Sequence, residues 1–114
     1  MSYTLRFSSR SLEDLDAVWD DVVEASKDYD TADRYIEDFL QKIGEKKIYP
    51  KSGIPLYYRG LFTGFYIVNF KAYKAFYRIN EDYIEIIRII PQKMDYMKVL
   101  FIKNEEDWRR KRED

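Results

Sequence analysis

Two strand-like runs that flank a polar turn, residues 73–79 and 83–90, constrain the fold of this chain more than any other feature. The first run mixes aromatic residues with Lys74 and Arg78, and the second is dense in isoleucine, which is typical of a strand at the centre of a sheet. The polar residues between the runs (NED) suit a tight turn. The sequence therefore predicts an antiparallel hairpin inside a sheet.

The register of this hairpin follows from its most compatible cross-strand neighbours. The pairs that we expect are Ile79 with Ile84, Tyr77 with Ile86, and Arg78 with Glu85. Alternation then divides the side chains into a first face, with Tyr73, Ala75, Tyr77 and Arg88, and a second face, with Phe76, Ile87 and Ile89. We expect the second face, with its short apolar rows, to pack on helices.

Arg88 needs an explanation, because it stands among isoleucines in the middle of a strand. One interpretation is that its side chain reaches an acidic partner within the protein or extends to water. The other is that the first face of the sheet meets a polyanion or an acidic protein. The residues alone leave both interpretations open.

Composition and charge bound the classes of function. A chain of 114 residues fits one domain, and it has no cysteine and no histidine, so any chemistry must use Lys, Arg, Tyr, Asp or Glu. Residues 1–46 carry six basic and twelve acidic side chains, whereas residues 47–103 carry ten basic and four acidic. This asymmetry indicates an anionic partner for the basic half. Without a long apolar run or a secretory signal, we expect a cytoplasmic protein that does not cross a membrane.

The acidic half is predicted to form a strand and two helices. Residues 3–7 alternate as a short strand, and apolar residues recur at helical spacing over residues 11–26 and 31–44. The expected helix caps are Ser11 and either Asp30 or Thr31. The short link between the helices predicts an antiparallel hairpin laid on the sheet. The paired carboxylates on these helices are typical of a solvated face, and we predict no metal site.

The basic half begins with residues 46–60, which contain two prolines and two glycines and are therefore predicted to be loop. Its cations and tyrosines suit either nucleic-acid contact or ordinary solvation, and the candidates for contact are Lys47, Lys51 and Arg59.

The remaining elements complete the predicted fold. Residues 64–70 form a further strand, and residues 94–102 form either an edge strand or an apolar segment that folds back on the helices. Residues 104–114, with Trp108, are a charged tail. The sequence thus predicts an α+β domain over residues 1–103 with the order β-α-α-β-β-β and a mostly antiparallel sheet.

This order of elements, together with five local matches, resembles the RelE/ParE superfamily of bacterial type II toxins. The matches extend over about residues 3–101 and are SLEDLDAVWDDV, ADRYIEDFLQKI, YPKSGIP, YKAFYRI and IEIIRIIPQKMDY. The YPKSGIP loop and the long helical hairpin are more similar to the ParE branch than to the RelE branch.

The resemblance implies a growth-inhibiting toxin of a plasmid-stabilising module, held inactive in a hetero-oligomer by a cognate antitoxin, with no cofactor. A small domain with a basic, tyrosine-rich face would accept an acidic, partly disordered antitoxin segment that orders on binding. ParE-like members poison DNA gyrase, and we favour this target. A degenerate toxin that retains only antitoxin binding is a further alternative.

RelE-like members instead cut mRNA on the ribosome, which is the second target that we consider. Transferred to this chain, their metal-independent catalytic set would be Lys71, Arg78, Arg88, Lys93 and Tyr96. The cations would stabilise the developing charge on the phosphate while the 2′-hydroxyl attacks. Lys71 and Lys93 stand where the more active members usually have arginine, and histidine is absent.

Overall fold

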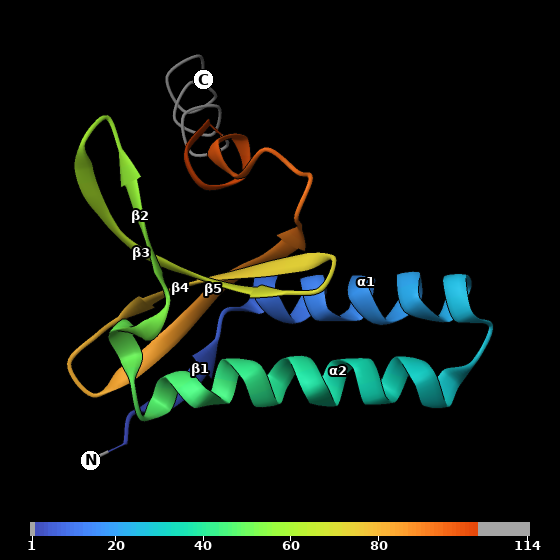
Figure 1. Cartoon of the computed structure of the whole chain (residues 1–114). Helices are drawn as coiled ribbons and strands as arrows, with labels where there is room; N and C mark the ends of the chain where they lie inside the picture. Colours follow the sequence, from blue (N-terminus) through green and yellow to red (C-terminus); the bar gives the residue numbers. More distant parts are fainter. Residues whose placement is uncertain (1, 103–114) are drawn as a thin grey trace, which may run out of the picture.

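The computed structural model describes residues 2–102 as a sheet with two helices on one face (Figure 1). In chain order the elements are β1 (Thr4–Phe7), α1 (Ser9–Ser26), α2 (Tyr29–Gly44), the 3₁₀ turns η1 (Glu45–Lys47) and η2 (Pro50–Ser52), β2 (Ile54–Tyr58), β3 (Leu61–Phe70), β4 (Tyr73–Ile79), β5 (Tyr83–Pro91) and the π-helical turn η3 (Lys98–Ile102). The strand order is β1-β5-β4-β3-β2, with β1 parallel to β5 and all other pairs antiparallel. The α+β class is confirmed.

The antiparallel helical hairpin is confirmed, but both caps lie upstream of the predicted residues. The side chain of Ser8 caps α1 by accepting a hydrogen bond from the Ser11 N–H at 3.0 Å. Ser11 is instead buried, and its hydroxyl donates to the Ser8 carbonyl. Asp28 caps α2, and α2 ends at Gly44 as predicted. Serine, threonine and aspartate residues a few positions away have the same capping chemistry. For this reason the sequence predicted each helix cap a few residues too late.

The predicted register of the β4–β5 hairpin is confirmed for all three expected pairs, but the assignment of its faces is wrong. A bulge leaves Tyr77 opposite Ile86 and Phe76 opposite Arg88, so Ile87 is an extra residue in β5. The helices cover the face that carries Tyr73, Ala75 and Tyr77, together with Ile84, Ile86 and Ile89. Phe76 and Ile87 share the opposite face with Ile90. The bulge reverses the alternation, which explains why Ile89 lies on the helical side.

The predicted loop over residues 46–60 contains an additional strand, β2, at the sheet edge. Pro55 is tolerated there because an edge strand leaves one side of its backbone unpaired, and the register with β3 shifts between Pro55 and Tyr57. The turn into β3 has positive φ angles at Arg59 (52°) and Gly60 (80°), which suit a two-residue hairpin. As a result β3 begins at Leu61 and is longer than predicted.

The segment after β5 forms neither an edge strand nor a cover for the helices. Leu100 is buried against Leu56, Phe76 and Ile90, on the face of the sheet that the helices leave uncovered. We call this face, opposite α1 and α2, the open face. Trp108 and the predicted tail over residues 104–114 lie outside the described residues, so the domain boundary stays a prediction.

A buried tyrosine hydroxyl fixes the basic loop between α2 and β2. Tyr77 is fully buried on β4, and its hydroxyl donates to the Pro50 carbonyl at 2.6 Å and accepts from the Gly53 N–H at 3.1 Å. A Cβ atom at Gly53 would collide with this hydroxyl, so glycine is needed there for close approach. Lys46 closes the loop by donating to the Ser52 hydroxyl at 2.8 Å. The loop is therefore a constrained part of the fold.

Arg88 has an acidic partner within the protein. Its Nε and Nη2 atoms donate to the two carboxylate oxygens of Asp14 on α1, at 2.7 and 3.1 Å, and both side chains are more than four-fifths buried. Asp14 also accepts from the Ile89 N–H at 2.9 Å. The last residue of β1 pairs with Ile86, so beyond that point α1 takes the place of a neighbouring strand along β5. The first interpretation of Arg88 is confirmed.

We predict that Tyr77→Phe destabilises the protein by about 1–3 kcal/mol, because it leaves the buried backbone groups of Pro50 and Gly53 without a partner. Urea denaturation at pH 7 measures this change. Burial raises the pKa of Tyr77 from 10.0 to about 12, so the folded state holds this proton more tightly than the unfolded chain. Its contribution to stability is complete below pH 10 and is lost as the pH rises towards 12.

The pH dependence of the free energy of unfolding supplies a control for the Tyr77→Phe prediction. Burial, followed by the hydrogen bond to Asp21, also raises the pKa of Tyr73 to about 12. Tyr77→Phe should therefore weaken, without abolishing, the loss of stability between pH 10 and 12. An unchanged slope, or a stability change at pH 7 below about 0.5 kcal/mol, would contradict this account.

We predict that Arg88→Ala lowers the free energy of unfolding by about 2–4 kcal/mol, because the Asp14 carboxylate then stays buried without its cation. Arg10→Ala is the matched control: its contact with Glu13 is exposed and long (3.8 Å), so its loss should change stability by less than about 0.5 kcal/mol. Similar stability of the two variants in chemical denaturation would refute a structural role for Arg88.

Candidate functional site

The open face of the sheet carries a nearly buried lysine. Lys74 lies on β4 and is 7% exposed. Its Nζ donates to the Gln92 carbonyl at 3.2 Å and lies 4.8 Å from the centre of the Tyr96 ring and 5.9 Å from that of Phe76. Within residues 2–102 no carboxylate forms a salt bridge with it. The Gln92 carbonyl and the faces of the two rings stabilise the Lys74 ammonium group. Because these groups are uncharged, the ammonium group can still attract an anion.

Gln92 and the turn after β5 position this lysine. The Gln92 side-chain amide donates to Asn69 Oδ1 at 3.0 Å and to the Tyr73 carbonyl at 2.9 Å, and the Gln92 N–H donates to the Ala72 carbonyl. These bonds fix the end of β5 beside the β3–β4 turn, so that the Gln92 carbonyl meets Lys74. The segment then returns over the open face, where the Tyr96 ring packs 5.7 Å from Phe76.

Of the five residues predicted as catalytic, Tyr96 lies next to Lys74, and Arg78 shares its face farther along β4. Arg78 is four positions after Lys74 in the strand, about 13 Å at 3.3 Å per residue. Arg78 already forms a salt bridge with Glu85, with Nη2–Oε1 at 2.9 Å. Lys93 is exposed in the turn after β5, and among the described residues it makes no salt bridge.

Lys71 and Arg88 lie away from this group. Lys71 is in the β3–β4 turn with a φ of 51°, and its Nζ lies 5.0 Å from the ring centre of Tyr35 on α2. It precedes the start of β4, whereas Arg78 lies near the other end, five residues or about 17 Å along the strand from Tyr73. Arg88 is turned to Asp14 on α1. The structure therefore does not gather Lys71, Arg78 and Arg88 around one point, and their catalytic role stays a prediction.

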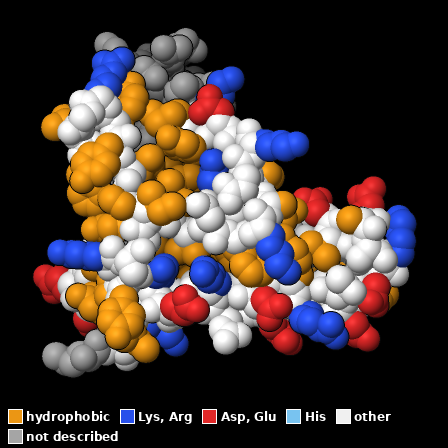
Figure 2. All heavy atoms as spheres, viewed as in Figure 1, with side chains coloured by type: hydrophobic (Ala, Val, Ile, Leu, Met, Phe, Trp, Pro, Cys, Tyr) orange, Lys and Arg blue, Asp and Glu red, His pale blue; other side chains and the backbone are white. Residues whose placement is uncertain are grey.

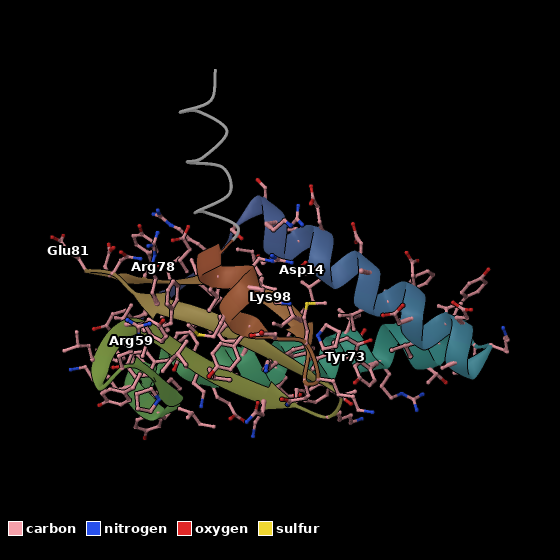
Figure 3. All side chains as sticks on the ribbon, turned by 90° about the horizontal axis from the view of Figure 1, so that it is seen from above. Asp14, Arg59, Tyr73, Arg78, Glu81 and Lys98 are labelled. Carbon is pink, nitrogen blue, oxygen red and sulfur yellow. The ribbon has the colours of Figure 1, made fainter. Side chains whose placement is uncertain are left out.

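The residues predicted to contact nucleic acid lie on two separate loops. Lys47 and Lys51 are exposed on the loop that Tyr77 fixes, where Lys51 borders a cavity of about 430 Å³. Arg59 lies at the tip of the β2–β3 hairpin, with its guanidinium 5.1 Å from the Tyr58 ring centre. Figure 3 shows Arg59 on this hairpin, apart from Arg78 on β4. Their role in nucleic-acid contact likewise stays a prediction.

The β2–β3 hairpin also exposes apolar side chains, and Figure 2 shows hydrophobic side chains gathered over the side of this arm that faces the viewer. Leu61 is 74% exposed, and Phe62 packs against Tyr57 with ring centres 5.7 Å apart. Ile54 and Leu61 lie on the opposite face of the hairpin from Tyr57 and Phe62, because Phe62 packs against Tyr66 on the helical side whereas Ile54 pairs with Ile67 on the open face. We call these four residues, Ile54, Tyr57, Leu61 and Phe62, the apolar arm. Exposed apolar areas of this kind mark surfaces that bind other molecules.

Sequence reasoning missed Lys74 and Gln92. Lys74 follows Tyr73 in a strand whose alternation would have placed it beside Phe76, but nothing in the sequence shows that a distant segment covers it. The part of the chain that the structure describes contains no group of three His, Cys, Asp or Glu side chains able to hold a metal ion. None of its helices is long and apolar enough to cross a membrane.

Solved structures with the same fold include toxin–antitoxin proteins. A chain of the chromosomal ParDE TA system from P. aeruginosa aligns with a TM-score of 0.67 and 18% identity, covering 79% of this chain and 96% of that one. A chain of the RelBE2 toxin–antitoxin complex from Mycobacterium tuberculosis aligns at 0.59 and 20% identity, with coverages of 81% and 100%. A mutant of the E. coli toxin RelE in the free state aligns at 0.63 and 17%, with coverages of 91% and 98%.

Sequence comparison gives the family directly. No curated protein sequence matches the chain. The family model described as the ParE toxin of the type II toxin–antitoxin system parDE matches residues 5–96, from β1 to Tyr96 next to Lys74. Since this match spans most of the chain, the protein belongs to the ParE toxins of type II toxin–antitoxin systems, within the RelE/ParE superfamily.

Proposed function

We propose that this protein is a growth-inhibiting toxin that acts on DNA gyrase and is neutralised by a cognate antitoxin. The observation that carries the choice of target is the separation of the cations. Cleavage of RNA without a metal ion needs several charged groups around one phosphate. Here Arg78 and Arg88 pair with carboxylates, and Lys71 lies at the far end of β4. A toxin that binds and traps a protein target has no such requirement.

The apolar arm supports a protein target. It combines two aromatic rings with two aliphatic side chains on a hairpin that projects from the sheet (Figure 1), and such residues are typical anchors of protein interfaces. Its edge strand, β2, has a neighbour on one side only. In this proposal the arm contacts gyrase.

The antitoxin belongs to the same proposal. The solved relatives with this fold include a ParDE system and a RelBE2 complex, in which toxin and antitoxin occur together. The excess of basic residues over residues 47–103 favours an acidic antitoxin segment, and a hetero-oligomer would keep the toxin inactive. Both candidate targets are cytoplasmic, so the toxin would act in the cytoplasm.

Ribosome-dependent cleavage of mRNA is the second candidate, and the pairing of Lys74 with Tyr96 favours it. The ammonium group of Lys74 forms no salt bridge within residues 2–102 and lies next to the ring of Tyr96. Such a pair has the chemistry to hold a phosphate and to assist proton transfer. Lys74, which lies next to Tyr96, would then be the main phosphate ligand. Lys71 lies instead beside Tyr35 on α2.

We predict that purified toxin inhibits gyrase supercoiling and that Leu61→Ser combined with Phe62→Ser raises the inhibitory concentration at least about tenfold, equivalent to ~1.4 kcal/mol. Tyr49→Ser, which changes an aromatic residue outside the arm that is 70% exposed, should leave inhibition within about twofold. In cells, induction should cause arrest with a DNA-damage response. Arrest with codon-phased mRNA cleavage would reject gyrase, and no arrest would indicate a degenerate toxin that retains only antitoxin binding.

We predict that Lys74→Met leaves growth inhibition within about threefold, because a gyrase poison does not need a phosphate ligand. If the protein cleaves mRNA instead, removal of this cation should reduce cleavage about 10²–10³-fold, and Lys74→Arg should restore much of it. The mutant protein should fold, since methionine matches the lysine stem in size. Thermal denaturation checks folding, and primer extension on messages from induced cells measures cleavage.

A further inference from the structure

The loop between α2 and β2 borders a cavity that the proposed toxicity does not use. It has a volume of about 430 Å³ and is lined by Tyr3, Ile48, Tyr49, Pro50, Lys51, Ser52 and Ile79. These residues come from three places in the chain: the segment before β1, the loop, and the last residue of β4. Figure 1 shows the three segments together at one end of the sheet, near the β4–β5 turn. A cavity of this size is in the range that binds small molecules. We call it the loop pocket.

Hydrogen bonds hold the walls of the loop pocket in place. The Tyr3 N–H donates to the Lys47 carbonyl at 2.8 Å, which joins the start of the chain to the loop. The Pro50 carbonyl accepts from the buried Tyr77 hydroxyl at 2.6 Å, which joins the loop to β4. A ligand would therefore find the backbone of the pocket already ordered, and this lowers the entropic cost of binding.

The lining of the loop pocket is mostly apolar, and part of it is open to water. Tyr3 and Ile79 pack against the core with one side and line the pocket with the other. Ile48 and Tyr49, which are neighbours in sequence, are 62% and 70% exposed. A flat apolar ligand would remove these two side chains from water and could pack against two tyrosine rings.

The loop pocket is also electropositive. Among the described residues, Lys51 is the only charged one in the lining, and it forms no salt bridge. A second cation, Lys46, lies behind the wall. It is 9% exposed, its Nζ donates to the Ser52 hydroxyl at 2.8 Å, and within residues 2–102 no carboxylate pairs with it. Two cations without a counter-ion favour a ligand that carries a negative charge.

The backbone of the loop indicates which anionic group fits. Phosphate sites commonly offer several free backbone N–H groups. Here four N–H groups of the loop already donate to acceptors within the protein, those of Ile48, Tyr49, Ser52 and Gly53. One exposed lysine suits a single negative charge. We propose that the loop pocket binds a small aromatic carboxylate, whose ring packs against Tyr3 and Tyr49 and whose carboxylate pairs with Lys51.

Two probes that differ only in charge test this proposal: 2-naphthoate, an aromatic carboxylate, and 2-naphthamide, its neutral amide. Each is titrated into the isotopically labelled full chain, and NMR chemical shifts of the backbone amides report binding. We expect naphthoate to bind with a Kd of about 1 mM or lower, at least about tenfold more tightly than naphthamide. The largest shift changes should fall in residues 46–53. Equal affinities, no binding of naphthoate, or the largest changes elsewhere would overturn the proposal.

Charge-matched variants test the role of Lys51. Lys51→Met should weaken binding of naphthoate about tenfold and leave that of naphthamide within about twofold, because only the carboxylate pairs with the ammonium group. Lys42→Met removes the same charge from an exposed position on α2 and should leave both affinities within about twofold. Equal losses in the two variants would mean that naphthoate senses only net charge, which contradicts a site at Lys51.

Aromatic variants test the wall of the pocket. Tyr49→Ala should weaken binding of both probes at least about fivefold, because it removes a ring against which they pack. Tyr29→Ala is the matched control: this tyrosine is 68% exposed on α2, and its loss should change neither affinity by more than about twofold. Unchanged binding in Tyr49→Ala would reject the loop pocket as the site.

Sedimentation of the protein alone tests the competing occupant, a second copy of this chain. We expect a monomer. A dimer that Ile48→Ser dissociates would assign the loop pocket to self-association and reject the proposal. The pocket variants keep all four residues of the apolar arm, so loss of naphthoate binding in them should not change inhibition of gyrase. Failure of this inference and failure of the proposed target are therefore separately visible.

Discussion

The burial of β4 on both faces is the constraint on which the rest of the structure depends. Five consecutive residues of this strand, from Tyr73 to Tyr77, are buried. The helices cover one face and the segment that contains Tyr96 and Leu100 covers part of the other. A strand enclosed in this way must give every polar group a partner. The Tyr77 hydroxyl finds its hydrogen-bond partners in the backbone of the basic loop, which it thereby fixes. The Lys74 ammonium group finds its partners in the Gln92 carbonyl and the Tyr96 ring.

Because the helices and the segment after β5 cover opposite faces of β4, the two sides of the molecule differ in chemistry. The helical layer is acidic and has an apolar seam, whereas the open face holds cations and the arm presents aromatic and aliphatic residues. Arg88, which the sequence places among isoleucines, is used to join α1 to the sheet through Asp14. Its charge is therefore not available for a ligand. The two sides of this small domain therefore differ in the chemistry that they present.

Local patterns predicted much of the fold, and long-range contacts explain the rest. Cross-strand compatibility gave the correct pairs of Ile79 with Ile84 and Arg78 with Glu85, because adjacent strands joined by a tight turn pair by local rules. The bulge at Ile87 reversed the faces, and β2 formed because an edge strand tolerates Pro55. The partner of Arg88 lies 74 residues away in sequence. Likewise, Lys74 becomes a candidate site residue only when the chain after β5 returns over it, and no periodicity predicts this.

The central claim is that β4 is enclosed on both sides and opens only when the whole domain unfolds. Native-state hydrogen exchange tests it most directly. The amides of Ala75, Phe76 and Tyr77 should exchange with an opening free energy equal to that of global unfolding, and at least as high as that of the α1 and α2 amides. Exchange of these amides through a local opening, at a free energy clearly below that of the helices, would contradict the account.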